Sequence, residues 1–593
     1  MSYFSIPSWC IQRVTSLGFV ALIALLYVGI WHDRPQAHNK APLKIPKGKH
    51  GDAIALTTAQ IIFIGYTLLA HFLGLTFPMR LVFATRSITK KLQKGLGQSP
   101  ITSDVLSNLP TATPSKLIES GYGEGYESSS SSSYTDESRT EVDETNDLLL
   151  HTIILPNYKE DIETLRETLE VLACHPQASS TYEVVLAMEM AESGAKGKAS
   201  VLMKEFSESF RDIEYTMHPN DIPGEAQGKS SNLCWAAKHV NGKYLDGHMK
   251  RNVIVTVMDS DSHLSAKYFS LINGMHFRYP QTAETTMYVP PIIFDRNAHL
   301  VPTPVRVADL MWAGAGLSGH YDSSSICPPT SVYSLPLCLV DHAGGWDAGD
   351  DSIGEDLHMY IKCFFSLNGN LTTRTILSPA SCSNVSTDGK GIRGFFKDCK
   401  ARYRQALRHM WGALDSGYVA RQVPTMWWNP SRVPGVERPH WGNTVVLLHR
   451  MYEAHFLPVH ITILIIGGAL YTLIVPPSLM HPLLLQTLNI TAYMRIGSFL
   501  GFATFFYLYE AYHYVCVKTR EEEMIRVGLA ERMLGAFSYR DMKNWADIAL
   551  FPVVGVVFGS LPTTVALVCH FWTLKLVYKV SKKPSWLPVG SPL

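Results

Sequence analysis

Residues 253–264 read V-I-V-T-V-M-D-S-D-S-H-L, so that an apolar and largely β-branched run is followed by two aspartates. Such a run predicts a strand buried on both faces of a parallel sheet. Ligands of open α/β sheets bind outside the carboxyl ends of the strands, so Asp259 and Asp261 are placed where a ligand would lie. Two aspartates one residue apart can direct both carboxylates at one divalent cation, which can neutralise a diphosphate. Capping of the next helix explains the same tripeptide, because Asp and Ser are preferred caps.

Polar residues also follow the other expected strands. Tyr158 and Glu160 lie in P-N-Y-K-E and can hold a base by stacking and hydrogen bonding, although a plain turn explains them equally well. Glu189 follows the second strand, where it contacts a nucleoside or is simply solvated. Lys229 opens a helix, and its ammonium would act with the free amides there on an anionic ligand. The spacing around Lys229 is not that of a P-loop.

Two further motifs, H-A-G-G-W-D and G-E-D-L-H, suit an acceptor and a base. The glycine pair that ends at Gly345 lets backbone approach a ligand closely, and Trp346 offers a flat face for a sugar. Asp356 then opens a helix, where a carboxylate is also a common cap. The basic aromatic segment around Gln405 and Arg408 is compatible with a site and with a snorkelling interfacial helix.

The order of these motifs resembles that of the membrane-embedded family-2 glycosyltransferases, which include cellulose, hyaluronan and chitin synthases and ceramide glucosyltransferases. The resemblance covers residues 150 to about 411 motif by motif, and the flanking helices by layout. It implies a GT-A-like, doubly wound, mostly parallel sheet domain inserted between transmembrane helices. It also implies an inverting hexosyltransferase that moves a sugar from a UDP or GDP donor to a growing polysaccharide at the cytoplasmic face, with or without export.

The resemblance implies a role for each motif. The donor would be held by Tyr158, Glu160, Glu189, Lys229, Asp259, Gln405 and Arg408, and Mn²⁺ or Mg²⁺ by Asp261 with Asp259. The acceptor side would consist of Gly345, Trp346, Asp347, Glu355, His409 and Trp411. Asp356 would be the general base that takes the proton of the acceptor hydroxyl.

Two positions depart from the family's pattern. The motif Q-x-x-R-W reads here as Gln405, Arg408 and then His409, with Trp411 two residues later. Because that tryptophan normally belongs to the acceptor site of processive enzymes, the change bears on processivity more than on transfer. Glu189 stands where the family usually has aspartate.

Other functions fit parts of the same pattern. A non-processive transferase with a lipid acceptor would use the same donor motifs. A silent scaffold would not need the intact D-x-D and E-D motifs, and a transporter would normally carry its ionisable groups within the spans. His263, beside the D-x-D motif, either helps the metal or starts the next helix, and we favour the second.

The elements expected to position these residues alternate along the middle of the chain. Strands are predicted at 148–155, 183–188, 213–217 and 253–258. Helices are predicted at 161–172, from the end of the second strand to about 210, and at 230–239. This alternation is typical of a mostly parallel, doubly wound sheet.

Composition and hydropathy predict an integral, multi-pass membrane protein. The net charge of +1 gives no reason to expect a nucleic-acid partner. Apolar runs that suit membrane spans lie at 14–31, 53–77, 457–475, 490–517 and 546–578. Basic residues after the second run place the catalytic domain in the cytoplasm, whereas those between 40 and 49 argue the other way. The ten cysteines show neither C-x-x-C pairs nor zinc spacing, so we predict no structural zinc and no disulfide framework.

The chain is therefore divided into five regions. They are an N-terminal membrane region at 1–97, a low-complexity linker at 98–147, the catalytic domain at 148–420, interfacial amphipathic helices at 421–456, and a C-terminal membrane region of three or four segments at 457–593. The membrane is the plasma membrane or an internal one.

Overall fold

The computed structural model describes residues 5–32, 56–96, 149–226, 228–387, 389–430, 436–529 and 545–576. The whole predicted linker at 98–147 lies outside the described residues, as do the basic residues between 40 and 49.

The described part of the chain contains a seven-stranded sheet in the order β3-β2-β1-β4-β7-β5-β8 and a two-stranded sheet of β6 and β9. All paired strands are parallel, except that β7 runs antiparallel to β4 and β5. The strands are β1 (Leu150–Asn157), β2 (Tyr182–Glu189), β3 (Asp212–His218), β4 (Val253–Val257), β5 (Thr286–Val289), β6 (Ile292–Phe294), β7 (Tyr333–Pro336), β8 (Thr372–Thr375) and β9 (Ala380–Cys382). The mostly parallel sheet predicted from the alternation of elements is confirmed, and β1 to β4 overlap the four predicted strands.

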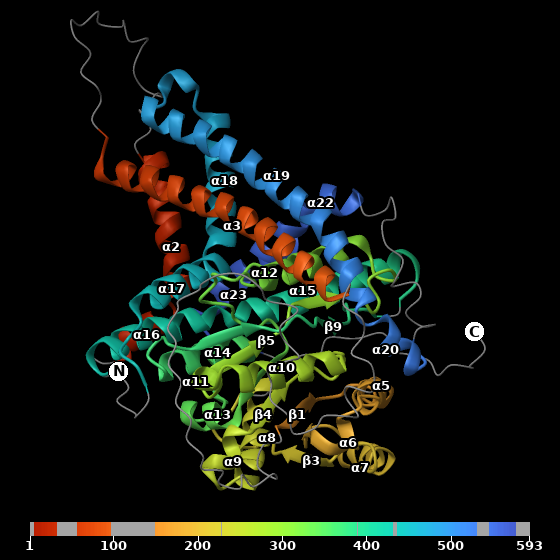
Figure 1. The fold of residues 1–593 in the computed structure, drawn as a ribbon. Helices are drawn as coiled ribbons and strands as arrows, with labels where there is room; N and C mark the ends of the chain where they lie inside the picture. Colours follow the sequence, from red (N-terminus) through yellow and green to blue (C-terminus); the bar gives the residue numbers. More distant parts are fainter. Residues whose placement is uncertain are drawn as a thin grey trace, which may run out of the picture.

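Helices cover both faces of the large sheet (Figure 1). Those of the sheet domain are α5 (Ile162–Ala173), α6 (Ala178–Thr181), α7 (Ala195–Glu205), α8 (Lys229–Lys243), α9 (Gly247–Arg251), α10 (Ala266–Arg278), α11 (Pro280–Ala283), α12 (Thr303–Leu317), α13 (Leu337–Ala343), α14 (Glu355–Ser366) and α15 (Gly391–Trp411). Alternate residues of β1 enter two cores, because successive side chains of a strand point to opposite faces. Ile153 and Leu155 pack with α5 and α10, whereas Ile154 packs with α8 and α14.

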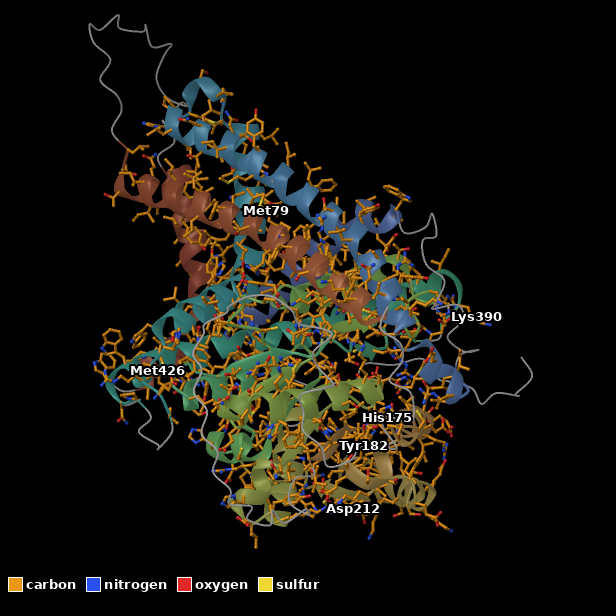
Figure 2. The ribbon with its side chains drawn as sticks, in the orientation of Figure 1. Met79, His175, Tyr182, Asp212, Lys390 and Met426 are labelled. Carbon is orange, nitrogen blue, oxygen red and sulfur yellow. The ribbon has the colours of Figure 1, made fainter. Side chains whose placement is uncertain are left out.

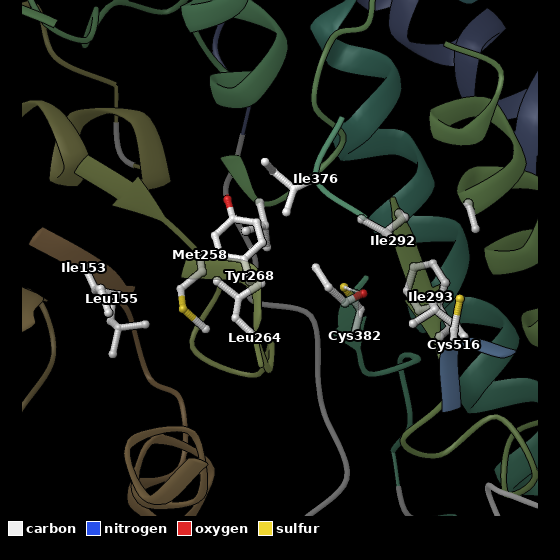
Figure 3. Close-up of a cluster of buried hydrophobic side chains, with 14 of the residues drawn as sticks. Ile153, Leu155, Met258, Leu264, Tyr268, Ile292, Ile293, Ile376, Cys382 and Cys516 are labelled. Carbon is white, nitrogen blue, oxygen red and sulfur yellow. Dashed lines mark hydrogen bonds between the residues drawn. The ribbon is translucent and has the colours of Figure 1, made fainter. Parts of the chain in front are cut away.

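The first core also joins the sheet domain to a long helix of the C-terminal region, α19 (Pro482–Lys518). Figure 3 shows Cys516 beside Ile293 of β6, and both residues are fully buried in the cluster that contains Met258 and Leu264 around the D-x-D turn. The apolar contact therefore packs the long helix against β6.

The remaining helices lie on one side of the sheet domain (Figure 1). They are α1 (Ser5–Gln12), α2 (Val14–Leu26) with the π-helix η1 (Tyr27–His32), α3 (Thr58–Leu96), α16 (Asp415–Trp428), α17 (Trp441–His455), α18 (Leu457–Ile474), α19 (Pro482–Lys518), α20 (Glu521–Arg526), α22 (Trp545–Gly555), the π-helix η5 (Val556–Ser560) and α23 (Leu561–Cys569). In Figure 1, α3 and α19 run side by side. Glycines permit this approach, because a Cβ at Gly497 would lie 2.8 Å from Leu75 and one at Gly501 would lie 3.0 Å from Pro78.

Three described helices are long and apolar enough to cross a membrane, at Thr58–Gly95, Leu457–Ile474 and Trp545–Cys569. They match three of the five predicted spans. The first predicted span corresponds to the shorter apolar helix Val14–Ile30. The fourth lies within α19, which is not among the three. The predicted interfacial region contains most of α16 and all of α17, with Trp427 and Trp428 exposed.

The fold also gathers a group of possible metal ligands that the spacing of the cysteines does not suggest. Ligand atoms of Cys174, His175 and Glu523 lie within 4.8 Å of one another, where α20 meets the end of α5. His175, labelled in Figure 2, has Nε2 2.6 Å from Glu523 Oε1 and Nδ1 3.1 Å from the hydroxyl of Tyr182. These contacts satisfy both ring nitrogens within the protein, so we read the group as a hydrogen-bonded brace between α20 and the sheet domain.

Candidate active site

A cavity of about 910 Å³ opens at the carboxyl ends of the parallel strands. Its lining includes Tyr158 after β1, Glu189 at the end of β2, His218 at the end of β3 and Asp259 after β4. The cavity then continues between α3, α18, α19 and η5. The sheet therefore brings together residues that lie about a hundred positions apart in the sequence.

A lysine and two carboxylates form the centre of the cavity wall. Lys229 Nζ lies 2.9 Å from Asp259 Oδ1 and 3.0 Å from Glu355 Oε2. Asp259 Oδ2 also accepts a hydrogen bond of 2.7 Å from the hydroxyl of Ser331. Burial alone would lower the pKa of Lys229, but Asp259 and Glu355 raise it, so the ammonium stays charged. The ammonium and the two carboxylates thus hold one another in place in the lining of the cavity.

Asp356 lies in the same wall, in the first turn of α14. Its Oδ1 accepts a hydrogen bond of 2.8 Å from the backbone N–H of Leu357. Burial, reinforced by the neighbouring charge of Glu355, raises the pKa of Asp356 to about 7, although Lys229 lowers it. A carboxylate with a pKa near neutrality can take a proton and release it, which a general base requires.

The D-x-D residues present oxygen ligands that suit a hard divalent cation. Asp259 and Asp261 both line the cavity, and Asp261 is buried. Because the carboxylate of Asp259 already contacts Lys229 and Ser331, Asp261 would be the main ligand. Magnesium-type sites commonly use one or two carboxylates together with substrate phosphates. The two residues therefore fit a Mn²⁺ or Mg²⁺ ion that also binds a diphosphate.

Beyond the edge strand β3, a histidine of the cavity lining bridges two glutamates, and no sequence motif marks this arrangement. His218 Nδ1 lies 2.9 Å from Glu189 Oε2, and its Nε2 lies 2.9 Å from Glu225 Oε2. Burial would lower the pKa of His218, but the two carboxylates raise it. His218 is opposite Glu189 in the register of β2 and β3. A correct prediction of this register from the sequence would therefore have placed His218 next to Glu189, but not next to Glu225.

We predict that His218→Gln weakens donor binding by roughly tenfold, because buried Glu189 and partly buried Glu225 lose the imidazole that holds both carboxylates. The effect should fall on the KM for the donor and much less on kcat. The matched control is His239→Gln, which removes a half-exposed imidazole that pairs with Glu214. An equal effect of both substitutions on the KM would contradict a role of His218 at the donor.

Four residues assigned to the acceptor lie outside the cavity lining. Trp346 is buried, and its indole N–H donates to the hydroxyl of Tyr333 at 2.7 Å and to Glu355 at 3.1 Å. The face that we expected to stack on a sugar is therefore covered, and the side chain instead positions Glu355. Gly345 precedes it with a φ of 73°.

The other two are also held by the protein. Asp347 pairs with His358 at 3.0 Å and Lys362 at 2.6 Å, which lower its pKa to about 2 against the effect of burial. The indole N–H of Trp411 donates to the carbonyl of Leu574 at 2.8 Å. Trp411 is thus held by the protein and lies outside the cavity lining.

The remaining predicted residues do line the cavity, namely Glu160, Glu355, Gln405, Arg408 and His409. His409 packs on Trp312 with ring centroids 4.4 Å apart. His263 is fully buried outside the lining and forms a backbone bridge to Ser381, so it neither faces the cavity nor starts α10.

Three consecutive buried residues, 295–297, hold in place the segments that carry residues of the site. Arg296 donates to the carbonyl of Asp261 and to Glu167, which fixes the D-x-D turn against α5. Asp295 pairs with Arg520 at 2.5 Å, beyond the end of α19. Asn297 accepts a 2.7 Å hydrogen bond from the backbone N–H of Asn384.

This support continues toward the helix that carries Gln405. The amide of Asn384 donates to Asp309 at 2.6 Å, and Asp309 pairs with Arg402 of α15 at 2.8 Å. No sequence motif marks these residues, because their partners lie between 35 and 225 positions away.

A mostly parallel sheet with a D-x-D motif beyond β4, and with Lys229 and Asp356 in the wall of the same cavity, is the arrangement expected of a glycosyltransferase. Residues 254–506 match the model of the glycosyl transferase family group 2, a stretch of less than half of the chain that includes Asp259, Asp356 and Arg408. The match and the site together make this protein a glycosyltransferase.

Solved structures, but no curated protein sequence, match the chain. One of them is a mannosyltransferase from Pyrobaculum calidifontis in complex with GDP-Man and Mn²⁺. It is 11% identical to this chain, with 66% of this chain and 86% of that chain covered and a TM-score of 0.37.

Proposed function

We propose that this protein is an inverting glycosyltransferase that extends a polysaccharide at the cytoplasmic face of a membrane, using a UDP- or GDP-sugar and Mn²⁺ or Mg²⁺. The observation that carries the proposal is the meeting of Lys229, Asp259, Asp261 and Asp356 in the wall of one cavity. Three helices are long and apolar enough to cross a membrane, and each contributes residues to the lining of the same cavity. This arrangement suits a multi-pass enzyme with export.

The geometry supports a single displacement. Asp356 takes the proton of the acceptor hydroxyl while that oxygen forms a bond to the anomeric carbon. The bond from this carbon to the donor diphosphate breaks, and the diphosphate leaves with the electron pair. Lys229 and Arg408 compensate the growing negative charge without donating a proton. A cation held by Asp261 would add further charge neutralisation at the diphosphate.

A lipid acceptor is the second candidate, because apolar residues such as Ile461, Ile465 and Phe502 line the part of the cavity between the helices. Burial of the apolar surface of a fatty chain there would stabilise its binding. Product analysis separates the two candidates, since a labelled polymer that resists lipid extraction excludes the lipid acceptor.

The test is a screen of radiolabelled UDP- and GDP-sugars with the purified full chain, in the presence of Mn²⁺ or Mg²⁺. We expect one nucleotide sugar, or two used together, to yield a labelled product. The new linkage in this product should have the anomeric configuration opposite to that of the donor. Retention of configuration would contradict the single displacement. Folded protein that neither binds nor consumes any nucleotide sugar would contradict the proposed function.

A further inference from the structure

The inner part of the cavity, bordered by α3, α18, α19 and η5, is here called the passage. It joins the space around Asp356 without a break. Although its walls belong to helices that are largely apolar, three arginines line it, Arg80 of α3, Arg450 of α17 and Arg495 of α19. Charged residues between membrane helices are costly and normally face a substrate path.

The first two arginines share one carboxylate. Arg80 lies 2.7 Å from Glu453 Oε2, and Arg450 lies 3.2 Å from the same oxygen. Arg450 also donates to the hydroxyl of Tyr321 at 3.2 Å. Two guanidinium groups facing one carboxylate leave an excess positive charge where the passage begins.

The third arginine lies deeper and contacts neutral groups. A guanidinium nitrogen of Arg495 lies 3.4 Å from His71 Nε2 and 3.4 Å from the hydroxyl of Thr491. His71 belongs to the apolar first half of α3, which is one of the three candidate spans. No ion pair of Arg495 with a carboxylate is found among the residues that the structure describes.

The depth of Arg495 distinguishes between possible occupants. His71, beside Arg495, precedes Arg80 by nine residues of α3, which corresponds to about 14 Å along a helix. A fatty chain beside Arg495 would place a charge in hydrocarbon, which is strongly unfavourable. An occupant that meets both levels of positive charge must therefore be polar and negatively charged over an extended length.

Other residues that line the cavity also suit sugars. Phe499 and Phe551 stack with ring centroids 5.2 Å apart and offer flat apolar surface. Thr462 and Ser560, whose hydroxyl oxygens lie 2.8 Å apart, line the same space. Flat rings, hydroxyls and spaced guanidinium groups together match the apolar faces, hydroxyls and carboxylates of an acidic sugar chain.

We infer that the passage binds an acidic glycan, so that the polymer carries carboxylate or other anionic groups and leaves the site along Arg80, Arg450 and Arg495. This inference rests on the proposed function, since it names the chemical class of the product. It requires that one donor be an acidic nucleotide sugar, such as a nucleoside diphosphate uronic acid.

The test measures binding of two labelled probes of about ten sugars, an oligogalacturonate and an uncharged cello-oligosaccharide, to the full-length protein in detergent. We expect the acidic probe to bind at least about tenfold more tightly at low salt, and the preference to fall at high salt because exposed charges are screened. Arg495→Gln should reduce the preference at least about fivefold, and Arg495→Lys should retain much of it. Arg86→Gln is the matched control, because Arg86 is an exposed residue of α3 outside the lining.

Equal binding of the two probes, or an acidic preference that Arg495→Gln and Arg86→Gln leave equally intact, would overturn the inference. Binding of a UDP- or GDP-sugar with Mn²⁺ is measured on the same samples. Donor binding without acidic preference refutes only the acidic glycan, whereas acidic preference without any donor binding supports the passage and refutes the transferase.

Discussion

Asp356→Asn should lower kcat by about 10³-fold, which lies within the range that general acid–base catalysis contributes. Asparagine keeps the shape of the side chain and can still contact the N–H of Leu357, but it cannot take the proton of an acceptor hydroxyl. The measurement is transfer of label from the donor found in the screen. Donor binding is the control for folding, and a variant with unchanged turnover would remove Asp356 from its role.

The pH dependence gives a second readout for the same residue. Because the base must be deprotonated, kcat/KM should rise with pH through about 7, the pKa of Asp356. A bound divalent cation would move this limb to lower pH, since positive charge favours the carboxylate. Lys229→Gln should move it to higher pH, because Lys229 lowers the pKa of Asp356 and its removal leaves Glu355 and Asp259 to raise it. The limb should be absent in Asp356→Asn.

The sequence predicted most of the large sheet because local patterns determine its strands. Four of the residues 253–257 are apolar and the fifth is Thr256, and they form β4 with all five residues buried. The placement of Asp259 and Asp261 at the cavity followed from the rule that ligands bind beyond the carboxyl ends of parallel strands. The motif order supplied Lys229, Asp356 and Arg408, which line the same cavity.

The sequence did not predict what depends on burial and on distant partners. Trp346 and Trp411 have the residue type that stacks on sugars, but the fold buries their rings and uses their indole N–H groups as donors. Arg296 has no motif around it, and its role at the D-x-D turn depends on Glu167, 129 positions away. Arg495 lies within an apolar run, and only the packing of α19 along α3 shows that it faces a cavity.

Asp261→Asn should reduce kcat by roughly 10³-fold, because a metal that neutralises the leaving group supplies several kcal/mol. The concentration of Mn²⁺ needed for half-maximal activity should rise more than about tenfold, a change that a merely structural defect would not produce. Asp221→Asn is the matched control, because Asp221 is an exposed carboxylate next to Asn220 and Ile222 of the cavity lining.

Arg296→Lys distinguishes the role of Asp261 as a metal ligand from the role of Arg296, which only positions Asp261. Lysine keeps a positive charge near Glu167 but cannot also hold the carbonyl of Asp261 with a second donor in the same plane. We expect a smaller rise in the required Mn²⁺ than for Asp261→Asn, with activity restored at saturating metal. If Asp261→Asn were instead restored fully by the same Mn²⁺ that restores Arg296→Lys, the carboxylate of Asp261 would not be the metal ligand, and Asp259 would take its place in the mechanism.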